Sequence, residues 1–342
     1  MKKNTVKFLL LMLLSGGLVS CIDEIELPIR VEKPKLVIDG LITNENTQYV
    51  VKLSFTGKYQ NSLATPANLA LNGAKVTIKD DRGRKTDLKQ DVLELGTYRT
   101  IDPSFVGTIG YSYKLEVTLP SGDKYSTKPE RMNEVAPILN LSYEFKNIVA
   151  NNQTDAYQVF LDTKDPGEQQ NFYRWSAYGY SRWESTGALC SAFGPTICYQ
   201  FCWVPTDYPQ VLLYSDASIN GNFIKKVPVF LSPIRAIGNH FIEVTQYSLS
   251  KDAYTFWSLY EEQRKRVGTI FDPQPAPIEG NLVNETDPTD IALGYFSVSS
   301  ISKKKLTIPI DVSVTGNPDL IPLGDCRRAF TNGTLDRPSG WE

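Results

Sequence analysis

The sequence has a single histidine, His240, and this scarcity excludes most histidine-based catalysis. A Ser/His/Asp or Cys/His arrangement would have to use His240, which starts an alternating strand pattern with no nucleophile-elbow glycines nearby. The chain also lacks an HExxH zinc motif, a phosphate-binding loop and a dinucleotide fingerprint. We therefore expect His240 to be a solvated or core histidine. The protein is predicted to be non-enzymatic and to use no catalytic cofactor.

Acidic clusters are too irregular to predict a metal site. Asp162, Asp165 and Glu168, or Asp287 and Asp290, could offer oxygen ligands to calcium, but neither stretch follows the EF-hand loop, and polar turns explain them more simply. No metal ligands are therefore assigned. Carboxylate pairs for glycoside hydrolysis stay open as a weaker alternative, because the separation they need is spatial.

Basic charge is also in short supply. The chain has 36 lysines and arginines against 38 acidic residues, and three of the lysines lie in the first seven residues. A protein that neutralises a phosphate backbone needs a basic stripe, and none is present. Nucleic acid is therefore not an expected partner.

Long apolar runs are absent apart from residues 8–14, which follow a lysine-rich start and precede Leu18-Val19-Ser20-Cys21. A basic start, an apolar stretch and small residues before a cysteine form a bacterial secretory signal, too short to span a bilayer stably. The last four residues fit a lipobox, so we predict a signal peptide over 1–20. Cys21 then carries diacylglycerol and an N-acyl chain. An ordinary cleaved signal followed by an incidental cysteine is the alternative.

The acids Asp23 and Glu24, with Glu26 nearby, follow Cys21 directly. An acidic run at this place resembles the export signal that sends lipoproteins to the outer face of the outer membrane. We expect residues 21–34 to form a lipidated tether and the protein to face the extracellular side. A merely solvated, flexible terminus is the alternative.

The composition favours pleated sheet, because 18 tyrosines and 15 phenylalanines accompany only 3 methionines. From residue 35 to 130, short alternating segments recur every ten to fifteen residues with turn signals between them, and none has a helical period. We predict an immunoglobulin-like β-sandwich over 35–130. A larger β-rich domain is expected over 131–342, so the fold class is mainly β.

Beyond Cys21 the chain has four cysteines, which allow two disulfides in three connectivities. They are Cys190, Cys198, Cys202 and Cys326. Zinc is the alternative for the close pair Cys198 and Cys202, but no second close pair follows. A bridge from Cys202 to Cys326 would close a long loop, worth about 4–5 kcal/mol on the chain-entropy model, and would tie the C-terminal tail to its domain.

An aromatic segment over 172–183 is the candidate binding surface. Its rings fall on both faces of a strand with a period of two, so it is either a stacking platform for a sugar or a partner protein, or a strand buried on both sides. The candidate residues are Tyr173, Arg174, Trp175, Tyr178, Tyr180 and Trp183.

One segment, 251–266, has a helical pattern. Ser250 suits the N-cap position and Asp252 the first turn. Ala253, Phe256, Trp257 and Tyr260 share one face, which we expect to pack on a sheet.

Several segments together resemble the family catalogued as domain of unknown function 4249. They are Glu243 to Tyr254, Ile270 to Asn281, Leu293 to Ser299, Cys202-Trp203, Gly324-Asp325-Cys326, Gly333-Thr334 and Pro338 to Trp341. The resemblance extends back to the N-terminal domain and covers nearly the whole mature chain. Members often have a second cysteine shortly before the one matching Cys326, which this chain lacks. With that departure, the resemblance favours the pairs Cys202–Cys326 and Cys190–Cys198.

The resemblance implies a Bacteroidota outer-membrane lipoprotein, typically encoded beside a TonB-dependent receptor, and supplies no catalytic residues. We therefore expect an accessory subunit of such a receptor or of a related outer-membrane protein complex. A glycan-binding or adhesion lipoprotein that uses the 172–183 cluster is the alternative.

Overall fold

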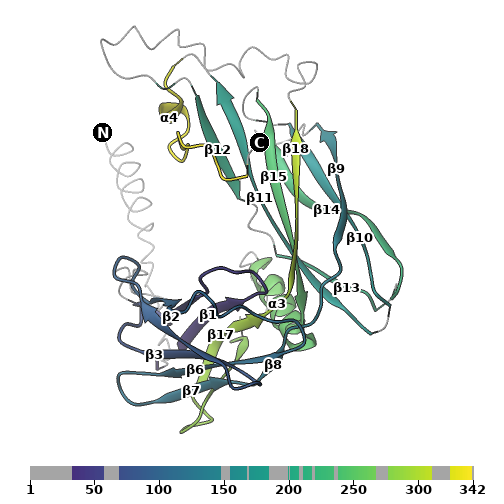
Figure 1. Ribbon diagram of the computed structural model, residues 1–342. Helices are drawn as coiled ribbons and strands as arrows, with labels where there is room; N and C mark the ends of the chain where they lie inside the picture. Colours follow the sequence, from purple (N-terminus) through teal and green to yellow (C-terminus); the bar gives the residue numbers. More distant parts are fainter. Residues whose placement is uncertain are drawn as a thin grey trace, which may run out of the picture. The chain divides into compact units, whose positions relative to one another are not determined.

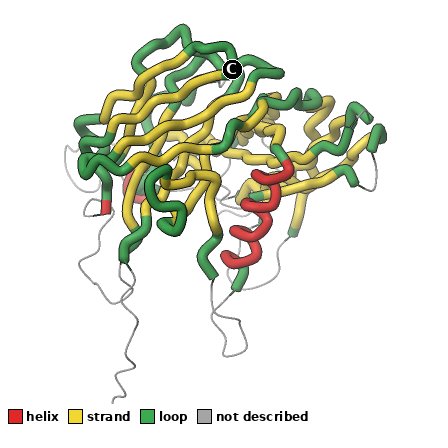
Figure 2. The backbone as a smooth tube through the Cα atoms, turned by 90° about the horizontal axis from the view of Figure 1, so that it is seen from below, coloured by secondary structure: helices red, strands yellow, loops and turns green. Residues whose placement is uncertain are grey.

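The structure is a computed structural model, and its chain divides into two compact units, Met1–Pro34 and Lys35–Glu342. Nearly all of the structure that can be described belongs to the second unit. The described residues are 33–57, 69–147, 155–167, 169–184, 199, 201–207, 211–217, 220–234, 238–266, 276–309 and 324–340. The fold is mainly β, as predicted (Figures 1 and 2).

The first sheet contains ten strands in the order β3-β4-β5-β2-β1-β17-β16-β7-β6-β8. Because β3 also pairs with β6, this sheet closes on itself. Eight strands come from the N-terminal part: β1 (Leu36–Ile42), β2 (Val50–Phe55), β3 (Lys75–Asp80), β4 (Lys85–Gln90), β5 (Thr97–Thr100), β6 (Ser112–Thr118), β7 (Lys124–Thr127) and β8 (Glu130–Arg131). Two come from much later in the chain: β16 (Glu279–Asn284) and β17 (Ile291–Val298).

The two late strands complete a sheet that the sequence assigned to residues 35–130 alone. β17 pairs with β1 in parallel, with Ile38 opposite Gly294. Gly294 has φ +80°, and a Cβ there would lie 1.8 Å from the carbonyl oxygen of Ile38, so only glycine fits. The pairing closes the sheet instead of forming two open immunoglobulin-like sheets. Local alternation cannot identify a partner more than 250 residues away, which is why the division at residue 130 leaves β16 and β17 out.

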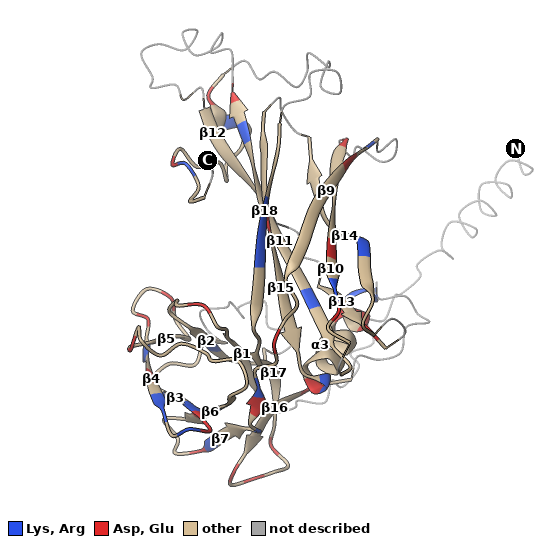
Figure 3. Ribbon diagram, turned by 45° about the vertical axis from the view of Figure 1, so that its right-hand side comes forward, with Lys and Arg blue, Asp and Glu red and all other residues tan. Residues whose placement is uncertain are grey.

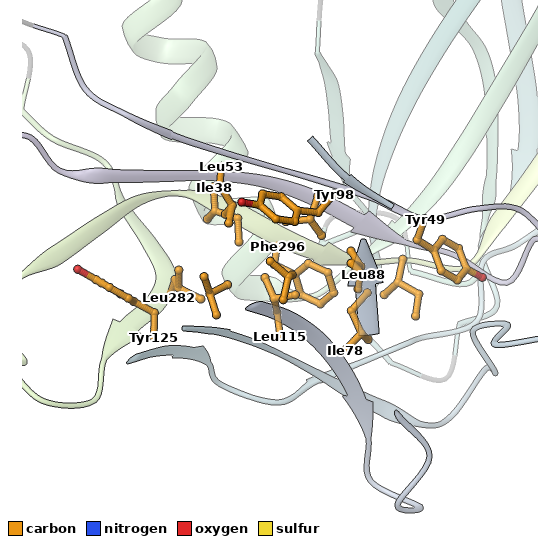
Figure 4. Close-up of a cluster of buried hydrophobic side chains, with 14 of the residues drawn as sticks. Ile38, Tyr49, Leu53, Ile78, Leu88, Tyr98, Leu115, Tyr125, Leu282 and Phe296 are labelled. Atoms are coloured by element: carbon orange, nitrogen blue, oxygen red, sulfur yellow. The ribbon is translucent and has the colours of Figure 1, made fainter. Parts of the chain in front are cut away.

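Inward-facing side chains from strands around the closed sheet fill its interior (Figure 4). In β1, every second residue is buried, as a half-buried strand requires. Leu282 of β16 and Phe296 of β17 lie in the same cluster as Ile38 and Leu115. The late strands therefore supply part of the core as well as backbone pairing.

Two further sheets pack face to face over a shared core of buried side chains from both. The three-stranded sheet has the order β14-β10-β9, and the other has the order β12-β11-β15-β18 with β13 paired to β11. Their bounds are β9 (Ile138–Lys146), β10 (Ala156–Lys164), β11 (Phe172–Glu184), β12 (Phe201–Asp207), β13 (Leu212–Ser215), β14 (Phe223–Pro233), β15 (His240–Leu249) and β18 (Ile301–Ile308).

The predicted helix is confirmed as α3 (Lys251–Arg264), which ends two residues earlier than expected. The Ser250 hydroxyl accepts a hydrogen bond from the amide of Ala253, so the N-cap is formed. The Phe256 ring lies 4.9 Å from that of Tyr295 on β17. The Tyr254 ring lies 4.9 Å from that of Phe172 on β11, so α3 contacts both the closed sheet and the five-stranded one. Among the described helices, none is long and apolar enough to cross a membrane.

The C-terminal segment 324–340 is fixed to the edge of β12. Thr334 and Trp203 exchange two backbone hydrogen bonds of 2.9 Å. A short helix, α4 (Cys326–Ala329), begins at the Asp325 N-cap, and Cys326 forms a disulfide with Cys202. This is the pair that the family resemblance favours; its expected companion, Cys190–Cys198, lies outside the described residues.

Candidate functional site

Strand β11 contains all six candidate binding residues, and the structure separates them into two groups. Its residues alternate between buried and more exposed along the whole strand. Tyr173, Trp175 and Trp183 point inward and are almost fully buried. The other three, Arg174, Tyr178 and Tyr180, lie on the opposite face. The strand is thus buried on one side only, and half of the predicted stacking platform belongs to the core.

The inward residues are held by hydrogen bonds as well as by packing. The indole Nε1 of Trp175 donates to Oε1 of Gln246 at 2.6 Å, and the Gln246 amide donates to the carbonyl of Ala136 at 2.6 Å. The Tyr173 hydroxyl donates to Asp165 at 2.6 Å, and burial together with this carboxylate raises the pKa of Tyr173. These rings position the sheet and are not available to a ligand.

The outward residues of β11 share a surface with neighbouring strands, because residues directly opposite in antiparallel pairs lie on the same side. Tyr178 is opposite Glu243 of β15, and Glu243 is opposite Lys305 of β18. We call this surface the outer face. Its defining residues are Arg174, Tyr178, Tyr180, Arg182, Lys303 and Lys305. Figure 3 shows the basic stripe on β18.

Arg174 is the cation that protein groups enclose most closely on the outer face. Its Cζ lies 4.5 Å from the ring centroid of Trp257 on α3 and 5.1 Å from that of Tyr247 on β15. Burial lowers the pKa of Arg174. The negative charge of Asp39 opposes this effect of burial. Two aromatic rings hold the guanidinium in place.

Tyr178 lies farther along the same face with 37% of its surface exposed. Its ring meets that of Tyr180 edge to face, with centroids 6.2 Å apart. Burial, and secondarily Glu243, raises the pKa of Tyr178 to about 12, so its hydroxyl stays protonated at neutral pH. Lys303 forms an ion pair of 2.6 Å with Glu45 and lies 3.9 Å from Glu243. The outer face thus combines half-exposed tyrosines with fixed cations.

Sequence reasoning missed the residues that other elements bring to this face. They are Tyr247, Trp257, Lys303 and Lys305, which lie at least 63 residues after the end of β11 in the chain. The run of three lysines in β18 is a signal that could have indicated two of them, since Lys303 and Lys305 fall on one side of a strand. Nothing local shows that this side meets the outward side of β11.

His240 is a core histidine. Its ring is 1% exposed, lies edge-on to Tyr157 at 5.2 Å, and has Nδ1 2.7 Å from the Ser232 hydroxyl and 3.3 Å from that of Ser181. Burial lowers the pKa of His240 to about 4. Of the two expectations for this residue, the structure supports the interior one.

A pH effect on stability follows from His240. The unfolded chain binds the proton near pH 6.5 and the folded chain only near pH 4. The free energy of unfolding therefore falls as the pH drops through this window, by up to about 1.4 kcal/mol per pH unit. Urea unfolding of wild type and His240→Asn at pH 7 and pH 5 measures the effect. We expect the difference in free energy of unfolding between wild type and His240→Asn to be smaller at pH 5 than at pH 7.

Comparing the two proteins removes the opposing contribution of Glu130. Burial raises the pKa of Glu130 to about 7, so the folded state takes up this proton first as the pH falls, which favours folding. Both proteins retain Glu130. An unchanged difference between wild type and His240→Asn at the two pH values would contradict the assignment of His240 to the core.

Where they are described, the acidic residues considered as calcium ligands accept hydrogen bonds from the protein itself, and Glu168 lies outside the described residues. Asp165 accepts hydrogen bonds from the amides of Gly167 and Gly221, and Asp162 accepts one from the amide of Lys226. Asp290 accepts from the Tyr125 hydroxyl at 2.5 Å. Over the described ranges, no three side chains of His, Cys, Asp or Glu gather into a group that could hold a metal.

Cys21, predicted to carry lipid, and Asp23 and Glu24, predicted to form the export signal, lie outside the described residues, as do Cys190 and Cys198.

Comparisons with known proteins give a family and little else. No curated protein matches the chain in sequence. A solved structure titled "Crystal structure of tetra-tandem repeat in extending region of large adhesion protein" is 14% identical, with a TM-score of 0.17, over 63% of this chain and 46% of that one. The family model for "Domain of unknown function (DUF4249)" matches residues 22–305. The chain therefore belongs to the DUF4249 family.

Proposed function

We propose that the protein is a non-enzymatic outer-membrane lipoprotein, exposed on the cell surface, that acts as an accessory subunit of a TonB-dependent receptor or a related outer-membrane protein complex. The observation that carries the proposal is the sequence Leu18-Val19-Ser20-Cys21 after a short apolar run. Thioether attachment of diacylglycerol to Cys21, followed by N-acylation after cleavage, supplies two or more acyl chains, which is what stable anchoring requires.

The acids Asp23 and Glu24 support an outward orientation of the anchored chain. In this proposal they act as the export signal, and residues 21–34 act as the tether between lipid and folded protein. No ligand chemistry is assigned to the tether. Its role is to hold the folded unit within reach of a membrane-embedded partner.

The outer face supports the docking part of the proposal. Tyrosine and arginine are enriched at the centres of protein–protein interfaces, because they offer large contact area with a polar group at the end. Here Tyr178 and Tyr180 lie beside Arg182, whose guanidinium Cζ is 5.3 Å from the ring centroid of Phe201. A cation that is held before binding loses less conformational freedom on binding. An acidic or carbonyl-rich surface of the receptor is the complement that this face suits.

Three of the six residues considered for glycan binding are buried in the core. Tyr173, Trp175 and Trp183 are buried, so a sugar could stack only on Tyr178 or Tyr180. These two rings meet edge to face and do not form one flat platform. We therefore prefer a protein partner.

The anchor is tested by replacing the cysteine that would carry the lipid. Cells expressing the full chain or Cys21→Ala are fed radiolabelled palmitate, and the chain is recovered through a C-terminal tag. The full chain is expected to be labelled and to stay with the membrane fraction, and Cys21→Ala to lose both properties. The double variant Cys202→Ser/Cys326→Ser, which leaves neither partner of that disulfide as a free thiol, is the cysteine control and should keep its label. Equal labelling of the Cys21→Ala chain, or none in either, would refute the lipid anchor.

A further inference from the structure

The loop between β4 and β5 presents apolar side chains to solvent. Val92 is 85% exposed, Leu93 is 90% exposed and Leu95 is 51% exposed. The loop is ordered by its own hydrogen bonds, since a carboxylate oxygen of Asp91 accepts from the amides of Leu93 at 2.8 Å and Glu94 at 3.1 Å. We call Val92, Leu93 and Leu95 the apolar tip. Exposed apolar groups gathered at one place indicate a contact surface.

The apolar tip lies at the end of the closed sheet where the tether joins it. Strand β1 starts at Leu36, which is opposite Phe55 at the end of β2. The amide of Leu53, two residues earlier, donates to the carbonyl of Gly96, which directly follows the tip. The amide of Thr56 donates to the carbonyl of Lys35. The tip and the start of β1 therefore share one end of the sheet.

The acids that flank the tip are bound by one arginine. The Arg99 guanidinium pairs with Asp91 at 2.7 Å and with Glu94 at 2.9 Å. The pKa of Asp91 is lowered to about 2. The hydrogen bond from Arg99 has the largest effect, and the amides of Leu93 and Glu94 have smaller ones. The two carboxylates beside the tip are thus both paired with Arg99.

We propose that the apolar tip rests in the headgroup region of the membrane leaflet that holds the lipid on Cys21. The inference rests on the proposed lipid anchor and adds the surface that faces the bilayer. A tether from residue 21 to 35 spans at most about 50 Å when fully extended, and any shorter path brings this end of the sheet closer to the lipid. Valine and leucine side chains gain from transfer into the acyl boundary, as in other interfacial anchors.

A neutral lipid is the probe that isolates the apolar contact. Two other connections lie at the same end of the sheet, because Tyr125 near the start of β7 is opposite Asn284 at the end of β16. Charges of both signs lie there, since Lys124 follows Asp123 and Lys114 lies 4.0 Å from Glu285. Phosphatidylcholine, which has no net charge, keeps these side chains from determining whether the tip binds.

The test places a reporter at the tip of the full lipidated chain. A genetically encoded, environment-sensitive fluorescent amino acid replaces Leu93 or, as the matched control, Ile101. Ile101 is 62% exposed and directly follows β5, at the opposite end of the same sheet. Each chain is reconstituted into phosphatidylcholine vesicles that contain spin-labelled lipid quenchers. Position 93 is expected to show a blue-shifted emission and at least a twofold quenching, and position 101 neither.

The outcomes separate this inference from the lipid anchor. Chains that float with the vesicles but show equal, unquenched emission at positions 93 and 101 would overturn the tip and leave the anchor intact. Chains that do not float would overturn the anchor and the tip together. In a further experiment, the chain is folded in buffer first and then mixed with the vesicles. Quenching at position 93 that persists under these conditions, and that is lost in the double variant Val92→Ser/Leu95→Ser, would support insertion of the whole tip.

Discussion

Replacing Trp175 by alanine is expected to lower the free energy of unfolding by about 3–5 kcal/mol, the usual cost of truncating a large buried ring. Trp175 is 1% exposed, packs on Tyr173 and Tyr214, and donates to Gln246. The substitution opens a cavity and removes the donor of a hydrogen bond to Gln246, which is itself fully buried. Both effects act in the same direction.

Urea unfolding followed by far-UV circular dichroism measures this loss. The control is Tyr178→Ala on the other face of the same strand, for which we expect a loss of about 1 kcal/mol or less, because its ring is partly exposed. A small loss for Trp175→Ala, with a large one for Tyr178→Ala, would contradict the assignment of the two faces. Loss of glycan binding in Trp175→Ala alone would therefore report unfolding, and Tyr178→Ala is the variant that tests a ligand contact.

Removing the disulfide between Cys202 and Cys326 is expected to cost about 4–5 kcal/mol on the chain-entropy model, because the two residues are 124 positions apart. The disulfide also holds a small apolar cluster in which the rings of Trp183 and Phe330 meet at 5.2 Å. Without it, the segment 324–340 would depend on this cluster, on the two hydrogen bonds between Trp203 and Thr334, and on contacts with Tyr199.

The double variant Cys202→Ser/Cys326→Ser is the appropriate protein, since either single change would leave a free thiol to mispair. Thermal unfolding and limited trypsin digestion measure the consequence, and cleavage at Arg327 or Arg328 is expected to become faster. The control is wild type treated in the same way after mild reduction and reoxidation. Identical melting temperatures and cleavage rates for wild type and the double variant would show that the segment is held without the bridge.

The positions of the strands could be predicted from the sequence, but the pairing between distant strands could not. The alternation in β1 and the cap at Ser250 are local signals, and both elements form as expected. The pairing of β1 with β17 joins segments more than 250 residues apart, and no local pattern encodes that choice. For the same reason the closed sheet could not be distinguished from an immunoglobulin-like sandwich, since both are built from short alternating strands.

The candidate site was predicted as one segment of the chain, whereas the structure shows a surface to which several elements contribute. A period of two places Tyr173 and Tyr178 on opposite faces of β11, and the structure agrees. Which face is inward depends on the three-stranded sheet that covers Tyr173, and the sequence of β11 contains no information about it. The rings that hold Arg174 belong to β15 and α3, so its environment is a property of the fold.

Docking on an outer-membrane receptor is the central claim, and purification of the complex tests it most directly. The full chain with a C-terminal tag is extracted from its native membranes in a gentle detergent, and the proteins recovered with it are identified by mass spectrometry. Tyr178→Ala changes the outer face, and Phe145→Ala, on β9 of the three-stranded sheet and 42% exposed, is the matched control. Truncating a residue at the centre of an interface typically costs about 2 kcal/mol, or roughly thirtyfold in affinity.

We predict that wild type and Phe145→Ala recover one outer-membrane receptor in stoichiometric amount, and that Tyr178→Ala recovers much less of it while remaining folded and membrane-bound. Repeated recovery of the wild-type chain alone would contradict the account.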